Sequence, residues 1–262
     1  MRHFVRKLRA IGSQNFAMWV EYRAELVLWV MAGILPLILM GVWREAGARG
    51  SFPLGPSEFV RYFLAVFVVR QLTFVWVIWE VEELVVSGRL SPLLLQPINP
   101  FWRFLMTHLT ERVVRLPLVI GIVLSCFLLY PEAAWLPSIT DLLGCFAGLA
   151  VSFGVRFLLQ YAFSMLSFWS ERASAIEELW FGMHLFLSGL VAPLDVYPAW
   201  LRSIAELTPF PYLIYFPAQL LLGHQPPLLK AGLVLGAWGS LAFVMYRVLW
   251  RRGLRQYSAM GA

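Results

Sequence analysis

The chain has 262 residues, of which 60 % are hydrophobic and 14 % are charged, and its formal net charge is +6. A soluble domain carries about 25 % charged residues and only about half apolar ones, so both fractions exclude a soluble protein. A membrane-spanning helix takes about 20 apolar residues, so six would use roughly 120 and leave no room for a soluble catalytic domain of ordinary size. The composition indicates an all-α membrane protein with a single transmembrane domain over residues 1–262.

The first segment, residues 2–20, is basic and amphipathic. Phe4, Leu8 and Ile11 recur at helical spacing, and arginines fill the remaining arc. Such a helix lies in the membrane surface with its apolar face in the lipid and its cations toward the headgroups. We therefore expect an N-terminal interfacial helix at the cytoplasmic surface. The alternative is a basic tail that only sets the orientation of the protein.

Six apolar stretches are long enough to cross a membrane. Pro36 lies inside the first stretch and predicts a kink, because a proline inside a helix removes a hydrogen bond. Pro117 stands near the start of the third, where a missing N–H costs nothing. The spans are predicted at about 25–43, 58–80, 116–136, 141–168, 176–194 and 227–249.

Most of the 21 lysine and arginine residues fall at the span ends that share a side with the two termini. Cytoplasmic loops are rich in lysine and arginine, so both termini are predicted to be cytoplasmic in a multi-pass protein of the plasma membrane, the bacterial inner membrane. The net charge is explained by these loops meeting lipid headgroups, and it gives no reason to expect nucleic acid. The exceptions are Arg44, Arg49, Arg202 and Lys230 on the outer side and Arg61, Arg70 and Arg156 within spans.

Charges deep within spans are costly and face neighbouring helices or an aqueous cleft. Arg70 and Arg156 lie too deep to reach the membrane surface easily. A structural pair inside the bundle and a contact to a transported substrate are both consistent with their position. The sequence does not show which acid would pair with them.

The connection between the second and third spans, residues 80–115, is the most polar part of the chain. Gly88 can end the preceding helix, and Pro92 and Pro97 delimit a single short helical turn. This turn is expected to display Leu93–Leu95 toward the cytoplasm. Exposed leucines require a partner that covers them, or they dip into the membrane interface.

A further helix is predicted to begin at Asn99-Pro100, a favourable cap followed by a proline in the first turn. His108 and Glu111 lie three residues apart on this helix and form the best available acid/base pair. A membrane-embedded enzyme that modifies lipids would use such a pair, so this class stays open as an alternative function. A scaffold subunit without its own transport path is a further alternative.

The motifs of nucleotide and metal chemistry are missing from the sequence. No G-x-x-x-x-G-K-[ST] stretch occurs, so any ATP that drives this protein must be bound by another subunit. The four histidines have no partner at metal-binding spacing, so no metal site is expected. The adjacent acids Glu82-Glu83 and Glu177-Glu178 could attract a cationic cargo, but they are better explained as solvated helix ends.

Residues 195–225 form the predicted outer connection between the fifth and sixth spans. Prolines divide it, and its apolar piece 212–222 makes roughly 16 Å of helix, which is too short to cross the membrane. We therefore expect an outer hairpin of re-entrant or interfacial helices here.

Two motifs resemble a known family. Residues 88–100 read GRLSPLLLQPINP, and residues 188–194 read SGLVAPL and are followed by Tyr197-Pro198. Together with the amphipathic start, they resemble the permeases of type-2 ABC (ATP-binding cassette) exporters, six-span subunits that pair with a separate ATPase. The resemblance covers essentially the whole chain and is closest to the subgroup that includes viologen-type exporters.

The resemblance implies a role for each motif. The turn 90–97 would be the coupling helix that docks in a groove of the ATPase, and residues 4–20 would be the interfacial connecting helix. A second permease, identical or related, would enclose the substrate path between the two copies, along the second and fifth spans. The coupling residues would be Arg89, Leu90, Leu93, Leu94, Leu95 and Pro97, and the path residues Arg70, Phe74, Phe181 and Ser188. No catalytic residue, metal or cofactor is assigned to this chain, and no motif identifies the cargo.

Overall fold

The computed structural model describes residues 2–50 and 52–257, and this part of the chain is helical without a strand. The all-α class is therefore confirmed. Three short 3₁₀ helices add to the α-helices: η1 (Pro131–Ala133), η2 (Met165–Phe168) and η3 (Leu194–Val196). The α-helices are α1 (Arg2–Glu21), α2 (Arg23–Ala32), α3 (Leu35–Ala48), α4 (Pro56–Thr73), α5 (Val77–Val86), α6 (Ser91–Leu94), α7 (Pro100–Leu129), α8 (Ile139–Ser164), α9 (Ala175–Leu187), α10 (Ala199–Ala205), α11 (Phe210–Leu213), α12 (Tyr215–Leu221) and α13 (Leu228–Gln256).

Five helical segments of the described chain are long and apolar enough to cross a membrane, which makes this a multi-pass membrane protein. The segment predicted as the fifth span, 176–194, is not among them. The five segments are Arg23–Ala48, Pro56–Val86, Pro100–Leu129, Ile139–Phe168 and Leu228–Gln256.

Two of these segments are interrupted. The first breaks at Gly33 and Ile34, between α2 and α3, and Pro36 stands in the first turn of α3. This agrees with the predicted kink. The second breaks at residues 74–76, between α4 and α5, where no proline or glycine in the sequence predicts a break.

α7 differs from the predicted third span, 116–136, at both ends. It begins after Asn99, whose side chain accepts a hydrogen bond of 2.9 Å from the backbone N–H of Phe101. Pro117 therefore lies inside a helix of 30 residues and not at its start. The predicted polar connection 80–115 shrinks to residues 87–99, because α5 and α7 extend into it from both sides.

α9 has 13 residues and is therefore about 20 Å long, whereas the apolar core of a membrane is about 30 Å thick. At its start, the backbone N–H of Ser174 donates to Glu82 near the end of α5. Beyond its end, the carbonyl oxygen of Gly189 accepts a hydrogen bond of 2.6 Å from Tyr62 near the start of α4. These two hydrogen bonds attach the chain before α9 to α5 and the chain after α9 to α4.

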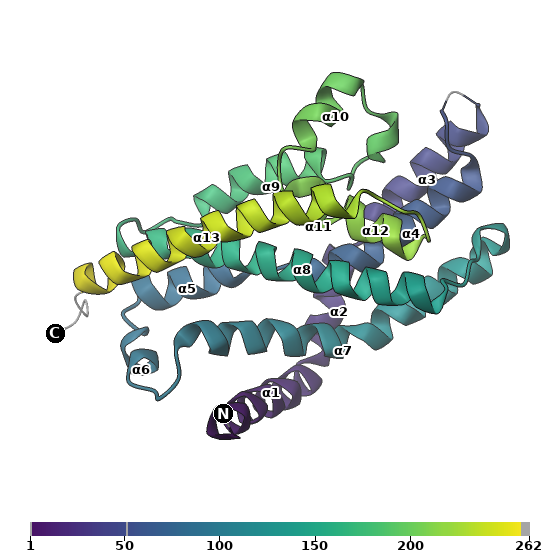
Figure 1. The fold of residues 1–262 in the computed structure, drawn as a ribbon. Coiled ribbons are helices and arrows are strands. Elements are labelled where there is room, and N and C mark those ends of the chain that lie inside the picture. Colours follow the sequence, from purple (N-terminus) through teal and green to yellow (C-terminus); the bar gives the residue numbers. More distant parts are fainter. Residues whose placement is uncertain (1, 51, 258–262) are drawn as a thin grey trace.

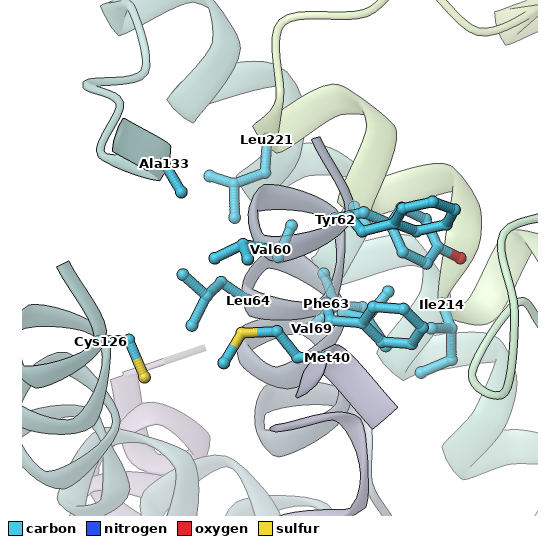
Figure 2. Packing of buried hydrophobic residues seen from close by; sticks show 14 of the residues in the cluster. Met40, Val60, Tyr62, Phe63, Leu64, Val69, Cys126, Ala133, Ile214 and Leu221 are labelled. Atoms are coloured by element: carbon cyan, nitrogen blue, oxygen red, sulfur yellow. The ribbon is translucent and has the colours of Figure 1, made fainter. Parts of the chain in front are cut away.

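α4 lies at the centre of the bundle. In the Pro56–Val86 segment, 67 % of an 18-residue apolar stretch is buried. The corresponding share in Leu228–Gln256, at the periphery, is 17 %. Side chains from α3, α7 and the short helices α12 and η1 surround α4. Figure 2 shows part of this packing, with Met40, Val60, Tyr62, Phe63, Leu64, Val69, Cys126, Ala133, Ile214 and Leu221 labelled.

The two ends of the bundle differ. α6 and both ends of the described chain gather at one end, whereas α10 and the turn between α3 and α4 lie away from it (Figure 1). The hydroxyl of Ser91 in α6 donates to the hydroxyl of Tyr257, the last described residue, at 3.3 Å. The predicted outer connection 195–225 folds as η3, α10, α11 and α12, and α12 packs against α8 and α4 inside the bundle.

Candidate functional sites

The connection between α5 and α7, residues 87–99, is the first candidate site, and we call it the coupling loop. It begins with a tight turn, in which Gly88 has φ +73° and the backbone N–H of Leu90 donates to the carbonyl of Leu84 at 2.9 Å. Glycine suits this left-handed conformation, in which other residues are strained. The turn places the short helix α6 across the ends of its two neighbours.

The structure divides the predicted coupling residues into two groups. Leu90 is fully buried among Val81, Val85 and Phe104, and Leu93 and Leu94 are half-buried against the same cluster. The expectation from the leucine run, that all of these leucines face the solvent, is therefore wrong. The exposed residues are Arg89, Leu95 and Pro97, and Leu95 is 88 % exposed.

The coupling loop is tied to both ends of the chain. The ammonium group of Lys7 in α1 donates a hydrogen bond of 2.7 Å to the carbonyl oxygen of Pro97. α1 packs along α7, with the side-chain amide of Asn15 donating to Thr107 at 3.1 Å. The Ser91–Tyr257 bond adds the end of α13. The loop is thus attached to α1 and to the end of α13, and it continues into α7.

A buried charge network on α7 is a feature that the sequence interpretation missed. Arg112 donates to the carbonyl oxygens of Leu72 and Phe74, which the break between α4 and α5 leaves without helical partners. Its guanidinium also lies over the ring of Phe153, 4.4 Å from the centroid. A cation suits this position because the C-terminal end of a helix carries partial negative charge.

Glu111 connects the rest of this network. Its carboxylate accepts hydrogen bonds from Arg115 and, at 2.9 Å, from the indole of Trp76. His108 lies 3.7 Å from Glu111 and 3.9 Å from Glu80. The spacing thus brings His108 and Glu111 together, but His108 is fully buried and Glu111 is 2 % exposed. The acid/base pair considered from the sequence therefore lies inside the bundle among charged partners.

One signal could have revealed this network. The sequence marks the start of a helix at Asn99-Pro100, which places Glu111 roughly 17 Å along that helix. The apolar run that follows Arg112 and Arg115 predicts a cytoplasmic location for both residues. The capping signal already placed them inside a helix.

The predicted path residues divide between two regions. Phe74 lies in the α4–α5 break, and the guanidinium of Arg156 on α8 lies 5.4 Å from the centroid of its ring. Arg70 is half-buried one turn earlier on α4. Phe181 on α9 is 37 % exposed, whereas Ser188, directly after the end of α9, is fully buried.

The adjacent acids have structural partners in three of four cases. Glu82 accepts from the backbone N–H and the hydroxyl of Ser174, and Glu83 pairs with Arg89. Glu177 is buried and accepts from the side chain of Gln160 at 2.6 Å, so it is not the solvated helix end that the sequence suggested. Glu83 and Glu178 remain exposed.

Another candidate site is a cavity of about 550 Å³ between the start of α4, the helices α10–α12 and the start of α13. Glu206 lies at its rim and accepts from Arg202 at 2.9 Å and from Lys230 at 2.5 Å. Burial alone would raise the pKa of Glu206, but these two hydrogen bonds outweigh it and lower the pKa. Burial and the neighbouring carboxylate of Asp195 raise the pKa of Tyr215. Within the described chain, no three His, Cys, Asp or Glu side chains are grouped to hold a metal ion.

The long apolar helices define a multi-pass membrane protein. Polar and charged side chains form clusters inside its helix bundle. Residues 57–261 match the family described as ABC-2 family transporter protein. Because this match covers more than half of the chain, the protein belongs to the ABC-2 family of transporter proteins. It is a permease subunit of an ABC transporter, and its family works with ABC ATPases.

The matched region begins at the first turn of α4 and contains the coupling loop, the α7 network and α9. No curated protein and no solved structure matches the chain.

Proposed function

We propose that the protein is the membrane subunit of an exporter that moves its substrate out of the cytoplasm, with ATP bound and hydrolysed by a separate ATPase. The coupling loop is the contact with that ATPase. One structural observation supports this proposal. The exposed Leu95 lies in a loop that is anchored by the buried Leu90, is hydrogen-bonded to α1 and to the end of α13, and continues into α7.

The mechanical role follows from this arrangement. Leu90 is buried and acts as the root of the loop, while Leu95 and Pro97 are free to enter a groove on a partner. When the ATPase closes on ATP, the groove moves and carries the loop with it. Because packed elements move as rigid bodies, the attached helices tilt and expose the path to the other side.

The same proposal sets the membrane topology. We infer six spans, with α9 and the residues after it as the short fifth one, and both termini in the cytoplasm of a bacterial cell. α6 and both ends of the described chain gather at one end of the bundle (Figure 1), which an even number of crossings requires. The exposed arginines at residues 251, 252 and 255 near this end support a cytoplasmic location.

We further propose that two permeases, identical or related, pair to enclose the path. α9 supports this pairing, because one side of it is exposed and apolar, including Leu179, Met183 and Phe186. The chain length and the order of the motifs support a place in the viologen-exporter-like subgroup. No catalytic residue, metal or cofactor of its own is assigned to the permease.

Leu95→Asp tests the coupling loop with little risk to folding, because the side chain is 88 % exposed. A charge at the docking contact is expected to abolish co-purification of the ATPase from native membranes and to remove ATP-driven transport. The matched control is Leu136→Asp, an equally exposed leucine (97 %) in the connection between α7 and α8. Unchanged ATPase binding and transport in Leu95→Asp would refute the proposal.

A further inference from the structure

A cationic group in the middle of the bundle is not explained by the coupling mechanism. The guanidinium of Arg156 lies 3.2 Å from the Nε2 atom of His184 and over the ring of Phe74. Arg70 lies one helical turn before Phe74, whose backbone N–H donates to the carbonyl oxygen of Arg70 at 3.0 Å. We call Arg70, Phe74, Arg156 and His184 the arginine cluster. It joins α4, α8 and α9, which are far apart in the sequence.

The arginine cluster is short of negative charge. The nearby acid Glu177 accepts a hydrogen bond from Gln160 with one carboxylate oxygen, while its other oxygen has no donor and forms no ion pair with Arg156. Arg115 adds a further positive charge toward Arg70 but is paired with Glu111. The ion pairs that the described residues form in this part of the bundle involve Glu80 and Glu111, and neither Arg70 nor Arg156 takes part.

Several donors in the arginine cluster have no acceptor among the described residues. Arg156 is 1 % exposed, yet its Nε atom lacks a partner, and so does one terminal nitrogen of Arg70. The Nδ1 atom of His184 and the hydroxyl of Ser188, one turn further along the chain, are also unpartnered. Buried donors are normally satisfied, so a group of such orphans indicates a missing acceptor.

We propose that the arginine cluster binds the anionic headgroup, a phosphate or carboxylate, of an amphiphilic cargo whose apolar part lies along Phe74. This inference rests on the proposed transport function and adds the substrate class to it. Guanidinium groups suit such oxygens because their N–H donors form paired, charge-assisted hydrogen bonds. Arg70 and Phe74 are only half-buried, so the cluster reaches the surface of the bundle.

Binding can be measured with the purified full-length permease in a nonionic detergent, without the ATPase. The probes are dodecyl phosphate, inorganic phosphate and dodecyltrimethylammonium, and the readouts are the dissociation constant and the thermal unfolding midpoint. We expect saturable binding of dodecyl phosphate, with a raised midpoint. Arg70→Gln is expected to weaken this binding at least tenfold, since it removes a charged donor. Arg70→Lys keeps the charge but loses the paired donors of the guanidinium. Its affinity for dodecyl phosphate is expected to lie between those of the unmodified protein and Arg70→Gln.

Arg247→Gln is the matched control. Arg247 also lies in a span with its guanidinium near a phenylalanine ring, 5.8 Å from the centroid of Phe243, but it is exposed on α13. Its loss is expected to leave dodecyl phosphate binding unchanged. The unfolding midpoint without probe checks that each variant is folded.

Three outcomes would overturn the inference. The first is that Arg70→Gln and the unmodified protein bind dodecyl phosphate equally well. The second is that dodecyltrimethylammonium binds more tightly than dodecyl phosphate. The third is that inorganic phosphate binds as tightly as dodecyl phosphate, which would make a free anion the ligand. Because the assay contains no ATPase, its failure leaves the coupling-loop proposal standing. Failure of the Leu95→Asp test likewise leaves this binding result unaffected.

Discussion

The side chain of Lys7 donates a hydrogen bond to the carbonyl oxygen of Pro97, which joins the first helix to the tip of the coupling loop across 90 positions of sequence. Lys7→Ala removes this bond. Because an exposed hydrogen bond contributes about 0.5–1 kcal/mol, we expect the affinity for the ATPase to fall roughly threefold. The measurement is the ATPase concentration that gives half-maximal activity of the reconstituted complex.

Arg9→Ala is the control for this change, because Arg9 is an exposed cation on the same helix. If both variants lower the affinity equally, then the general positive charge of α1 is responsible and the Lys7–Pro97 contact is not.

Arg112 is expected to be the most sensitive side chain of the α7 network. Arg112→Ala leaves the carbonyl oxygens of Leu72 and Phe74 without donors in the break between α4 and α5. Because hydrogen bonds to charged groups contribute about 1.5–3 kcal/mol, we expect a loss of about 3 kcal/mol in the free energy of unfolding. Denaturation of the purified permease in mixed micelles measures it.

Arg103→Ala gives the comparison on the same helix. Arg103 forms one weak contact of 3.5 Å with Gln96 near the membrane surface, so its removal is expected to change the free energy of unfolding by less than about 0.5 kcal/mol. Equal destabilisation by both variants would contradict the capping role of Arg112.

The sequence predicts those features of the fold that depend on local signals. Hydropathy predicts four of the long helices closely, and Asn99-Pro100 indicates the start of α7. Features that depend on distant partners were missed. Arg112 is accommodated in the apolar bundle because it donates to backbone carbonyl oxygens that are free at the break after α4. No residue near 74–76 in the sequence predicts that break.

The candidate sites show the same division. Pro92 and Pro97 delimit the turn of the coupling loop, but its leucine run could not show that Leu90 points inward, because that depends on Phe104 and the end of α13. The family resemblance places Arg70 and Phe74 on the substrate path because both belong to the second predicted span. Their neighbours Arg156 and His184 come from other helices, so their grouping could not be read from spacing.

Gly189 is predicted to be essential for the way α9 ends. It has φ +86°, and a Cβ atom built on it would lie 2.6 Å from the hydroxyl of Tyr62 and 3.0 Å from Leu194. Gly189→Ala therefore combines a strained backbone with a clash, and we expect it to lower the free energy of unfolding by about 2–3 kcal/mol. Gly182→Ala in the middle of α9 meets nothing within 4 Å and is expected to be neutral or to stabilise the helix by up to about 1 kcal/mol.

Both glycine variants can be compared by thermal unfolding of the purified protein in one detergent. The sign of the difference is decisive, because an alanine favours a helix at position 182 and opposes the turn at position 189. A loss of stability at 182 as large as that at 189 would show that α9 tolerates no methyl group, and the explanation by backbone conformation would be wrong.

The ion pairs around Glu206 make the end of the bundle opposite the coupling loop sensitive to acid. The hydrogen bonds from Arg202 and Lys230 lower the pKa of Glu206 in the folded protein, so its ionised form stabilises the fold at pH values above its unfolded pKa. This contribution is lost as the pH falls from about 4.3 through the lowered folded value. We expect the thermal unfolding midpoint to drop across that interval. The midpoint of Glu206→Gln is expected to drop less, because this variant has no carboxylate to protonate at position 206.

Glu132→Gln, at an exposed acid with a single contact of 3.7 Å to Arg44, is expected to keep the full acid sensitivity. Equal pH dependence of Glu206→Gln and the unmodified protein would exclude Glu206 as its source.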